Sequence, residues 1–315
     1  MKRFSKFAIA TLAALLATSA VASAEDMLKL AIGQRGKWDG AIPELGQRGG
    51  IFKKHGLQLE ILYTSGGGET MQAVISGSVD IGTSAGTLGV FAAFVKGAPV
   101  RIIGAQATGD DAFWYVRADS PIKGPADFNG KTLAYSTNGS STNANVLAMI
   151  EHYKVSAKPV ATGNAGSTYT QVMSGQIDIG WSAPPFMLAP LVKGDIRVVA
   201  KSMDLPLVKG HSIRVNIANA ELLAKKADAF KRFNAAYRET VEWMYASDEA
   251  LKIYADFAEV TVDEARMIRR DFDPREMVEL DKIAGLEDLM KDAITLKFLT
   301  APLTAAQIGE MVQIP

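Results

Sequence analysis

Short apolar runs alternate with segments of helical spacing along the first two-thirds of the chain. Runs of this length, bounded by turn residues, predict buried strands. We expect strands at residues 28–32, 57–63, 79–82, 100–106, 132–136, 159–162, 177–181 and 196–200, with helices at 43–55, 70–76 and 141–153. Strands that alternate with helices indicate βαβ units, so the fold class predicted is α/β with mainly parallel sheets and flanking helices.

The last third of the chain has a different pattern. Apolar residues recur at helical spacing throughout residues 220–246, which predicts one long amphipathic helix. Thr261 and Glu264 have the spacing of a capping box and predict the start of another helix. We expect this helical tail to pack on the first lobe of the protein.

A segment of the chain occurs twice. Residues 64–85 align without a gap on residues 162–183, at an offset of 98 positions, with 11 identities in 22. Two copies are too few for a solenoid, so the repeat predicts two similar lobes that face each other across a cleft. Segments 113–118 and 211–218 lie at the transitions between lobes, and both are predicted to be extended and to cross the hinge.

These patterns predict a division of the chain. Residues 1–24 form a signal peptide, 25–116 the first part of lobe I, 117–210 lobe II, and 211–315 the second part of lobe I with the helical tail. Lys2, Arg3 and Lys6 precede the apolar run 7–21, and Ala22-Ser23-Ala24 gives a cleavage pattern, which predicts a cut after Ala24 and a periplasmic protein. The run is shorter than the roughly 20 residues of a spanning helix, and the mature chain is not expected to span a membrane.

Composition excludes several kinds of chemistry. The chain has no cysteine, which excludes thiolate metal sites, cysteine nucleophiles and disulfides. Its three histidines are scattered at 55, 152 and 211, so no metal site and no cofactor are predicted. Without residues 1–24 the chain has 31 basic and 34 acidic residues and no basic stripe, and we expect no nucleic-acid partner.

Small polar residues and glycines follow the predicted strands, in loops 33–39, 64–68, 83–87, 136–143, 162–167 and 181–185. In open α/β sheets ligands bind beyond the carboxyl ends of strands, where helix N-termini favour anions. Each loop alone is equally typical of ordinary helix caps, but six converging loops predict a polar cleft. The candidate ligand-binding residues are Gln34, Trp38, Asp39, Gly66, Gly67, Ser84, Thr137, Asn138, Ser140, Ser141, Trp181 and Ser182.

Some residues have two interpretations. Trp38 and Trp181 follow strands, and we expect them to form apolar cleft walls, with surface packing as the alternative. Asp80 and Asp178 recur in the repeat and resemble paired carboxylates, but turn residues of this kind commonly bond the backbone, so we expect a scaffold role and no catalytic residue. Arg35 is the nearest candidate for a charged contact to an anion.

The chain resembles the periplasmic substrate-binding proteins of ABC importers for nitrate, sulfonates, taurine and thiamin-pyrimidine precursors. The resemblance extends to about residue 245 and rests on segments 49–57 (GGIFKKHGL), 67–74 (GGETMQAV), 76–82 (SGSVDIG), 127–132 (DFNGKT) and 174–180 (SGQIDIG). It implies the type II two-lobe fold of these proteins, which closes on a small-molecule solute and delivers it to a permease and ATPase complex. We expect a monomer.

The resemblance leaves the ligand and the role open. An organic anion, a sulfonate or a carboxylate, is the best candidate because the cleft is predicted to hold hydroxyls and backbone N–H groups. A periplasmic sensor is one alternative. An enzyme on the same fold is another, although the pyrimidine synthases of this fold carry a cysteine-rich motif that this chain lacks.

Overall fold

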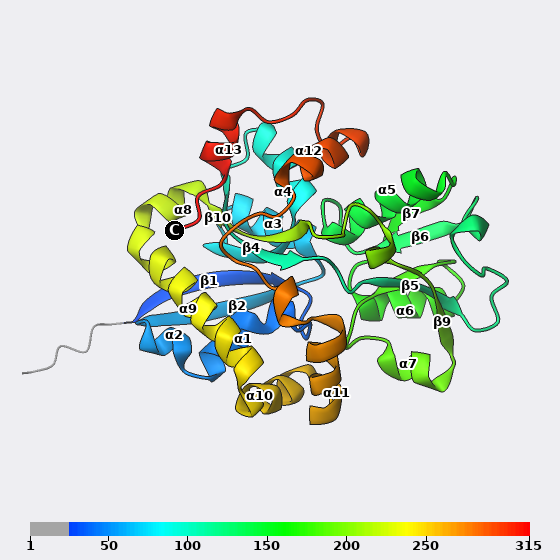
Figure 1. Ribbon diagram of the computed structural model, residues 1–315, viewed down its shortest axis with the longest axis horizontal. Coiled ribbons are helices and arrows are strands. Elements are labelled where there is room, and N and C mark those ends of the chain that lie inside the picture. The colour runs from blue at the N-terminus through cyan, green and yellow to red at the C-terminus, as the bar shows by residue number, and fades with distance from the viewer. Residues whose placement is uncertain (1–24) are drawn as a thin grey trace, which may run out of the picture.

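The computed structural model describes residues 25–315, and the predicted signal peptide lies outside them. The chain forms two α/β lobes that lie side by side (Figure 1). Lobe I contains the larger sheet and the C-terminal helices. Lobe II contains the strands and helices between residues 113 and 201. The two-lobe α/β architecture predicted from the repeat is therefore confirmed.

Lobe I is built on a five-stranded sheet. Its order is β2(Leu57–Thr64), β1(Asp26–Gly33), β3(Ile81–Gly86), β10(Ser212–Asn219), β4(Val100–Thr108). β1 is parallel to β2 and β3, whereas β10 is antiparallel to both of its neighbours. The sheet is mixed because a single strand, β10, opposes the direction of the others.

Lobe II repeats this arrangement with shorter strands. β5(Phe113–Arg117) pairs antiparallel with β8(Gly180–Ser182) and β9(Ile196–Lys201), and β6(Thr132–Tyr135) pairs parallel with β7(Lys158–Ala161). A parallel bridge between Leu133 and Ile179 joins the two groups. The resulting order β7-β6-β8-β5-β9 matches that of lobe I, with the opposed strand in the same place. Helices α5(Ser141–Tyr153), α6(Ala165–Met173) and α7(Leu188–Lys193) complete the lobe.

The sequence repeat corresponds to equivalent contacts in the two lobes. α3(Gly67–Ile75) and α6 occupy equivalent places after β2 and β7. The hydroxyl oxygens of Thr64 and Thr70 are 2.8 Å apart, and those of their counterparts Thr162 and Thr168 are 2.6 Å apart. In both lobes this threonine pair ties the end of a strand to the first turns of the next helix.

The repeated aspartates are scaffold residues, as predicted. Asp80 Oδ2 accepts the backbone N–H of Lys29 in β1 at 2.8 Å, and Asp178 Oδ2 accepts that of Thr132 in β6 at 2.8 Å. Each carboxylate thus bonds the strand beside its own. Lys226 adds an ion pair to Asp80 at 2.8 Å.

Helices cover both faces of the lobe I sheet. α1(Ile42–Arg48), α9(Ala227–Ala246) and α10(Asp248–Ala258) pack on one face, and α3 and α4(Thr87–Val95) on the other. The helix predicted at 43–55 is interrupted at Gly49 and Gly50, where φ of Gly50 is +75°, so α2(Ile51–Lys54) is separate. The helix predicted at 220–246 also breaks, at Lys226, into α8(Ala220–Lys225) and α9.

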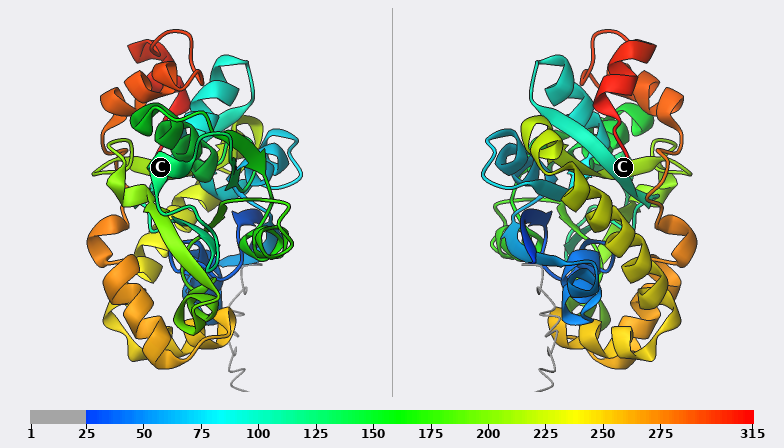
Figure 2. Two further views of the ribbon diagram at one scale, coloured as in Figure 1. Left: turned by 90° about the vertical axis from the view of Figure 1, so that its right-hand side faces the viewer. Right: turned by 90° about the vertical axis from the view of Figure 1, so that its left-hand side faces the viewer.

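The helical tail packs on lobe I, as predicted. The capping box of Thr261 and Glu264 is present at the start of α11(Val262–Met267), which continues into a π-helical turn over Ile268–Phe272. A short turn over Arg275–Met277 follows, and then α12(Leu286–Thr295) and α13(Ala305–Met311), which contact α4 and β4. Figure 2 shows this last third, yellow to red, running along lobe I.

The chain passes between the sheets twice, after β4 and after β9. The predicted crossing segments 113–118 and 211–218 are extended, but each is a strand within one sheet, so the prediction that they cross is wrong. The passages are the short loops before them, residues 109–112 and the region 202–211. The lobe boundaries after residues 116 and 210 stay a prediction and lie near these passages. No helix within residues 25–315 has the length and apolarity to cross a membrane.

Candidate ligand-binding cleft

A small cavity of about 40 Å³ lies between the lobes. Loops at the carboxyl ends of lobe I strands meet loops and helix starts of lobe II around it. Its lining consists of Gly33, Gln34, Lys37, Gly66, Gly67, Ser84, Asp110, Ala112, Ser136, Ser140, Ser141, Thr142, Trp181, Ala183 and Arg214. Polar residues from both lobes therefore line one shared space.

The lobes are closed on one another, and glycines make this possible. The backbone N–H of Gly68 in α3 donates to Thr137 Oγ1 of lobe II at 3.0 Å. A Cβ atom on Gly68 would lie 2.1 Å from the carbonyl oxygen of Asn138, and one on Gly89 in α4 would lie 2.1 Å from that of Gly139. No side chain fits between these backbones, so closure requires glycine on the lobe I side.

Two helices begin at the cavity, one from each lobe. α3 begins at Gly67 and α5 at Ser141, and both residues line the cavity. Ser140 is the N-cap of α5, and its Oγ accepts the N–H of Asn143 at 3.2 Å. The unbonded N–H groups and partial positive charge of helix N-termini favour an anionic group between them.

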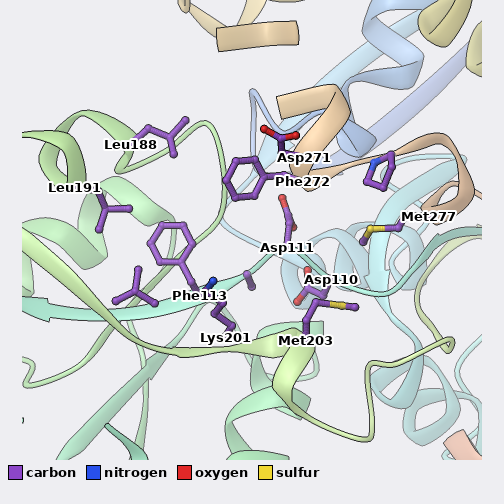
Figure 3. A pocket seen from close by; sticks show the side chains of 13 residues that line it. Asp110, Asp111, Phe113, Leu188, Leu191, Lys201, Met203, Asp271, Phe272 and Met277 are labelled. Atoms are coloured by element: carbon purple, nitrogen blue, oxygen red, sulfur yellow. The ribbon is translucent and has the colours of Figure 1, made fainter. Parts of the chain in front are cut away.

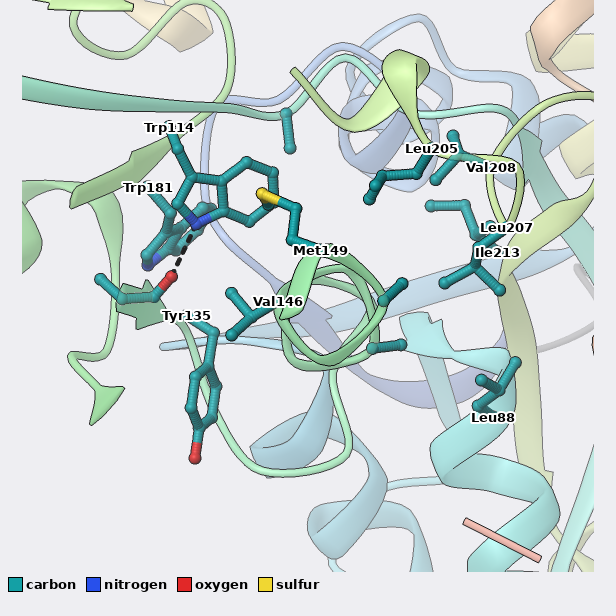
Figure 4. Close-up of a cluster of buried hydrophobic side chains, with 14 of the residues drawn as sticks. Leu88, Trp114, Tyr135, Val146, Met149, Trp181, Leu205, Leu207, Val208 and Ile213 are labelled. Carbon is teal, nitrogen blue, oxygen red and sulfur yellow. Dashed lines mark hydrogen bonds between the residues drawn. The ribbon is translucent and has the colours of Figure 1, made fainter. Parts of the chain in front are cut away.

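Trp181 adds a side-chain donor to the cavity lining. Its side chain is buried, and Nε1 has no hydrogen-bond partner within residues 25–315. By contrast, the indole N–H of the neighbouring Trp114 donates to the Ala134 carbonyl at 2.8 Å, the bond dashed in Figure 4. Because buried donors are nearly always satisfied, the free N–H of Trp181 indicates a missing acceptor.

Two lining residues have a strained backbone. Gln34 has φ +71° and Ser84 has φ +63°, in the left-handed region that non-glycine residues seldom occupy. Gln34 donates through Nε2 to the Ser65 carbonyl at 2.6 Å, and Gln106 Nε2 donates to Ser84 Oγ at 2.9 Å. Such strain persists only where surrounding contacts impose it, and it concentrates at ligand sites.

A buried network of charges adjoins the cavity. Arg214, from β10, donates through Nε to Asp39 at 2.9 Å and through Nη1 to Asp110. Lys37 pairs with Asp111 and lies 3.7 Å from Asp39 Oδ1. Asn145 of α5 donates to Asp110 at 2.8 Å, which connects the network to lobe II. Within residues 25–315 no acidic or histidine group is arranged to hold a metal ion.

The network leaves little net charge for a ligand. Burial by itself would raise the pKa values of Asp39 and Asp110, but Arg214 and Lys37 outweigh it and hold both pKa values below the usual range. Burial raises the pKa of Asp111 to about 6, against the opposing effect of Lys37. Carboxylates therefore balance both cations of the cluster.

Seven of the predicted site residues line the cavity: Gln34, Gly66, Gly67, Ser84, Ser140, Ser141 and Trp181. Four others lie beside it with protein partners. Asp39 pairs with Arg214, Thr137 accepts from Gly68, Asn138 accepts the hydroxyl of Tyr135, and Ser182 donates to the Phe186 carbonyl.

The prediction that Trp38 forms a cleft wall is wrong. Trp38 is fully buried, donates to the Tyr245 hydroxyl at 2.9 Å, and packs edge-on against Tyr254 with ring centroids 4.7 Å apart. The prediction of Arg35 as a charged contact is also wrong. Its half-exposed side chain pairs with Glu259 at 3.6 Å and stacks on Phe257, outside the cavity.

The charged residues of the cavity were missed by the sequence analysis. Two signals point to them. β10 alternates Ser212, Arg214 and Asn216 with apolar residues, a polar face within a strand that is buried throughout. The adjacent Asp110 and Asp111 lie in the loop after β4, where ligand loops of α/β sheets lie.

The two lobes, the interlobe cavity and the matched strand orders define the periplasmic binding protein fold. A family model described as NMT1/THI5 like matches residues 45–250, about two-thirds of the chain. The chain belongs to this family.

Solved structures with the same fold cover nearly the whole chain. The periplasmic aliphatic sulphonate binding protein SsuA from Escherichia coli has 16% identity and a TM-score of 0.68, covering 92% of each chain. The alkanesulfonate-binding protein SsuA from Xanthomonas axonopodis pv. citri, bound to MOPS, has 15% identity and a TM-score of 0.74, covering 92% of this chain and 98% of that one. The nitrate-binding protein NrtA from Synechocystis PCC 6803 has 14% identity and a TM-score of 0.71, covering 91% and 86%. No curated protein sequence matches this chain.

Proposed function

We propose that this protein is the solute-binding component of an ABC importer and that it captures a small organic anion by closing its lobes. The observation that carries the proposal is the free indole N–H of Trp181, a residue that lines the cavity where α3 and α5 begin. Helix N–H groups, hydroxyls and an indole N–H together favour an oxyanion such as a sulfonate or a carboxylate.

Neutral donors hold the anion in this proposal. Arg214 and Lys37 already have carboxylate partners, so the ligand gains from fixed dipoles rather than from a free cation. The closed cavity of about 40 Å³ has room for on the order of three or four heavy atoms, enough for a sulfonate or carboxylate head group. This supports the sulfonate and carboxylate class over large aromatic solutes.

The transport role and location belong to the same proposal. The solved relatives are named as periplasmic binding proteins for sulfonates and nitrate, which supports a periplasmic protein that delivers solute to a permease and ATPase. A sensor that presents the closed form to a receptor is the alternative. A permease and an ATPase encoded beside this chain would favour the importer.

A thermal-shift screen of the purified protein tests the proposal. The panel contains alkanesulfonates, carboxylates, nitrate, pyrimidines and amines of matched size. A ligand that binds only the native state stabilises it by about 2.7 kcal/mol at a hundredfold excess over Kd, so a sulfonate or carboxylate should give a clear shift. Native mass spectrometry before the screen identifies any solute that copurifies.

Trp181→Phe provides the sharper test, because it removes the N–H and keeps most of the ring. Loss of one charge-assisted hydrogen bond should lower the affinity for the anion about tenfold, and the melting temperature of the ligand-free protein should stay unchanged. Equal affinities of wild type and Trp181→Phe, or shifts with amines alone, would contradict the proposal.

A further inference from the structure

A second cavity, of about 460 Å³, adjoins the cleft cavity and shares only Asp110 and Ala112 with its lining. It is bounded by β5, α7 and β9 of lobe II and by the segment after α11 that packs on lobe I (Figure 3). Its apolar lining comprises Ala112, Phe113, Leu188, Leu191, Val198, Met203, Phe272, Pro274 and Met277, and its charged lining Asp110, Asp111, Lys201 and Asp271.

The cavity has the character of a small-molecule pocket. Pockets for small organic ligands measure roughly 300–1,000 Å³ and combine mainly apolar walls with few polar groups. Aromatic rings come from both sides, Phe113 from β5 and Phe272 from the π-helical turn, and both are labelled in Figure 3. A flat organic ligand with one or two rings would therefore contact side chains of both lobes.

Two carboxyl oxygens beside this cavity have no hydrogen-bond partner in the part of the chain that the structure describes. Asp111 is completely buried, and its Oδ2 has no hydrogen-bond partner within residues 25–315. The same holds for Oδ2 of the buried Asp273, next to Phe272 in the chain. Burial raises the pKa of Asp273 and favours its protonated form, so the acceptor here that lacks a donor among the described residues is Asp111 Oδ2, at a cost of about 1–3 kcal/mol. A ligand that supplies N–H donors would remove this cost.

The charged groups that line the cavity also favour a ligand with N–H donors. Three carboxylates and one ammonium group line the cavity. Lys37, Arg214 and Arg270 each pair with one of these carboxylates, but none of these three cations lines the cavity. A ligand inside therefore meets carboxylate groups in preference to cations.

We propose that this cavity is a second ligand site, which binds an amphiphilic organic amine with its apolar body between Phe113, Leu191 and Phe272 and its ammonium group directed to Asp111. The preference is opposite to that of the cleft, whose lining offers donors to an anion. Because Trp181 does not line this cavity, the two sites are separable by mutation.

Isothermal titration of the exported protein with three probes of one shape tests the ligand class. The probes are 2-naphthylmethylamine, 2-naphthalenemethanol and 2-naphthoate. The amine should bind at least tenfold more tightly than the carboxylate, with the alcohol between them. Absence of amine binding, or a carboxylate that binds as tightly, would overturn the proposal.

Two substitutions place the binding in this cavity. Leu191→Trp fills the cavity from α7, and Met203→Trp fills it from the turn after β9. Each substitution should therefore lower the affinity for the amine at least tenfold. The matched control is Val192→Trp, because Val192 is the next residue, is 89% exposed and does not line the cavity. Val192→Trp and Trp181→Phe should both retain amine binding. Equal effects of Leu191→Trp and Val192→Trp, or loss of the amine in Trp181→Phe, would place the amine elsewhere.

Discussion

Single residues beside the cleft carry buried charges, which are stable there because each has a partner of opposite charge. Lys37, Asp39, Asp110 and Arg214 come from three separate segments, namely the loop after β1, the passage after β4, and strand β10. All four side chains are at most 10% exposed. A buried ion pair contributes little net stability, but removal of one partner leaves an uncompensated buried charge.

Arg214→Met should therefore destabilise the protein strongly. It leaves Asp39 and Asp110 without their main partner, and loss of a buried partner costs about 3–5 kcal/mol. Urea unfolding followed by circular dichroism measures the change. The control is Arg35→Met, which breaks an exposed pair and should cost at most about 1 kcal/mol. Similar losses in both variants would show that Arg214 is not the centre of a buried network.

The buried carboxyl group of Asp111 makes the free energy of unfolding depend on pH, and its raised pKa sets the direction of that dependence. Burial raises the pKa of its carboxyl from 3.8 to about 6 in the native state, although Lys37 opposes the shift. Between these pH values the native state binds a proton that the unfolded state does not. The stabilisation is therefore full below pH 3.8 and is lost as the pH rises through 6.

A comparison of the wild type with Asp111→Asn isolates the contribution of this carboxyl group to the pH dependence of stability. The free energy of unfolding of the wild type, relative to the variant, should increase by on the order of 2 kcal/mol between pH 7.5 and 4.5. Urea titrations at several pH values measure it. A difference that stays constant, or that falls toward low pH, would contradict the raised pKa.

At the scale of elements, local patterns in the sequence predict much of the fold. A strand forms at each of the eight expected places, although β3 and β8 begin only at Ile81 and Gly180, and the helix expected at 141–153 is α5. The interrupted helices were mispredicted because apolar spacing continues across Gly49–Gly50 and across Lys226, while the breaks depend on backbone geometry and on packing with distant segments. The same applies to Trp38, whose partners Tyr245 and Tyr254 lie more than 200 positions away.

The contact between α4 and lobe II gives a prediction about one helix. Gly89→Ala places a methyl group 2.1 Å from the Gly139 carbonyl, so the lobes can no longer close fully. Alanine is also about 1 kcal/mol better than glycine in a helix, so the open protein should be no less stable. We expect ligand affinity to fall at least tenfold while the melting temperature without ligand stays or rises.

Gly309→Ala is the matched control for this substitution. Gly309 lies in α13, and a Cβ atom there would meet nothing within 4 Å. The control should keep full affinity. If Gly89→Ala also kept full ligand affinity, the close packing of α4 on the Gly139 loop would not be needed for ligand binding.

At the scale of the whole molecule, the repeat is the sequence feature that predicts most. It predicts two matched lobes and therefore a cleft, and the loops at strand ends supply seven of the residues that line the cavity. The identity of the charged residues was not predictable in the same way. Arg214 reaches the cleft because β10 inserts between β3 and β4 of the lobe I sheet, a strand order that local patterns do not give.

The pseudo-symmetry also places a pair of equivalent residues opposite each other across the lobes. Ser65 follows β2, and its counterpart Gly163 follows β7 at the offset of 98. A Cβ atom on Gly163 would lie 3.9 Å from that of Ser65, within the 3.5–4.5 Å range of disulfides. Gly163 has φ +78°, so cysteine strains the backbone there, and the Gly163→Cys single variant measures that cost. Because the chain has no cysteine, Ser65→Cys with Gly163→Cys permits a single intramolecular bridge.

This double variant reports lobe closure directly. Ligand binding shifts the population toward the closed form, so ligand should accelerate formation of the bridge under mild oxidation. Once formed, the bridge should hold the lobes closed, slow both entry and release of ligand, and be reversed by a reducing agent. Stopped-flow binding with the oxidised and reduced protein measures these rates, and the two single variants serve as controls. A bridge that forms at the same rate with and without ligand, and that leaves both binding rates unchanged, would mean that the lobes do not open for the solute.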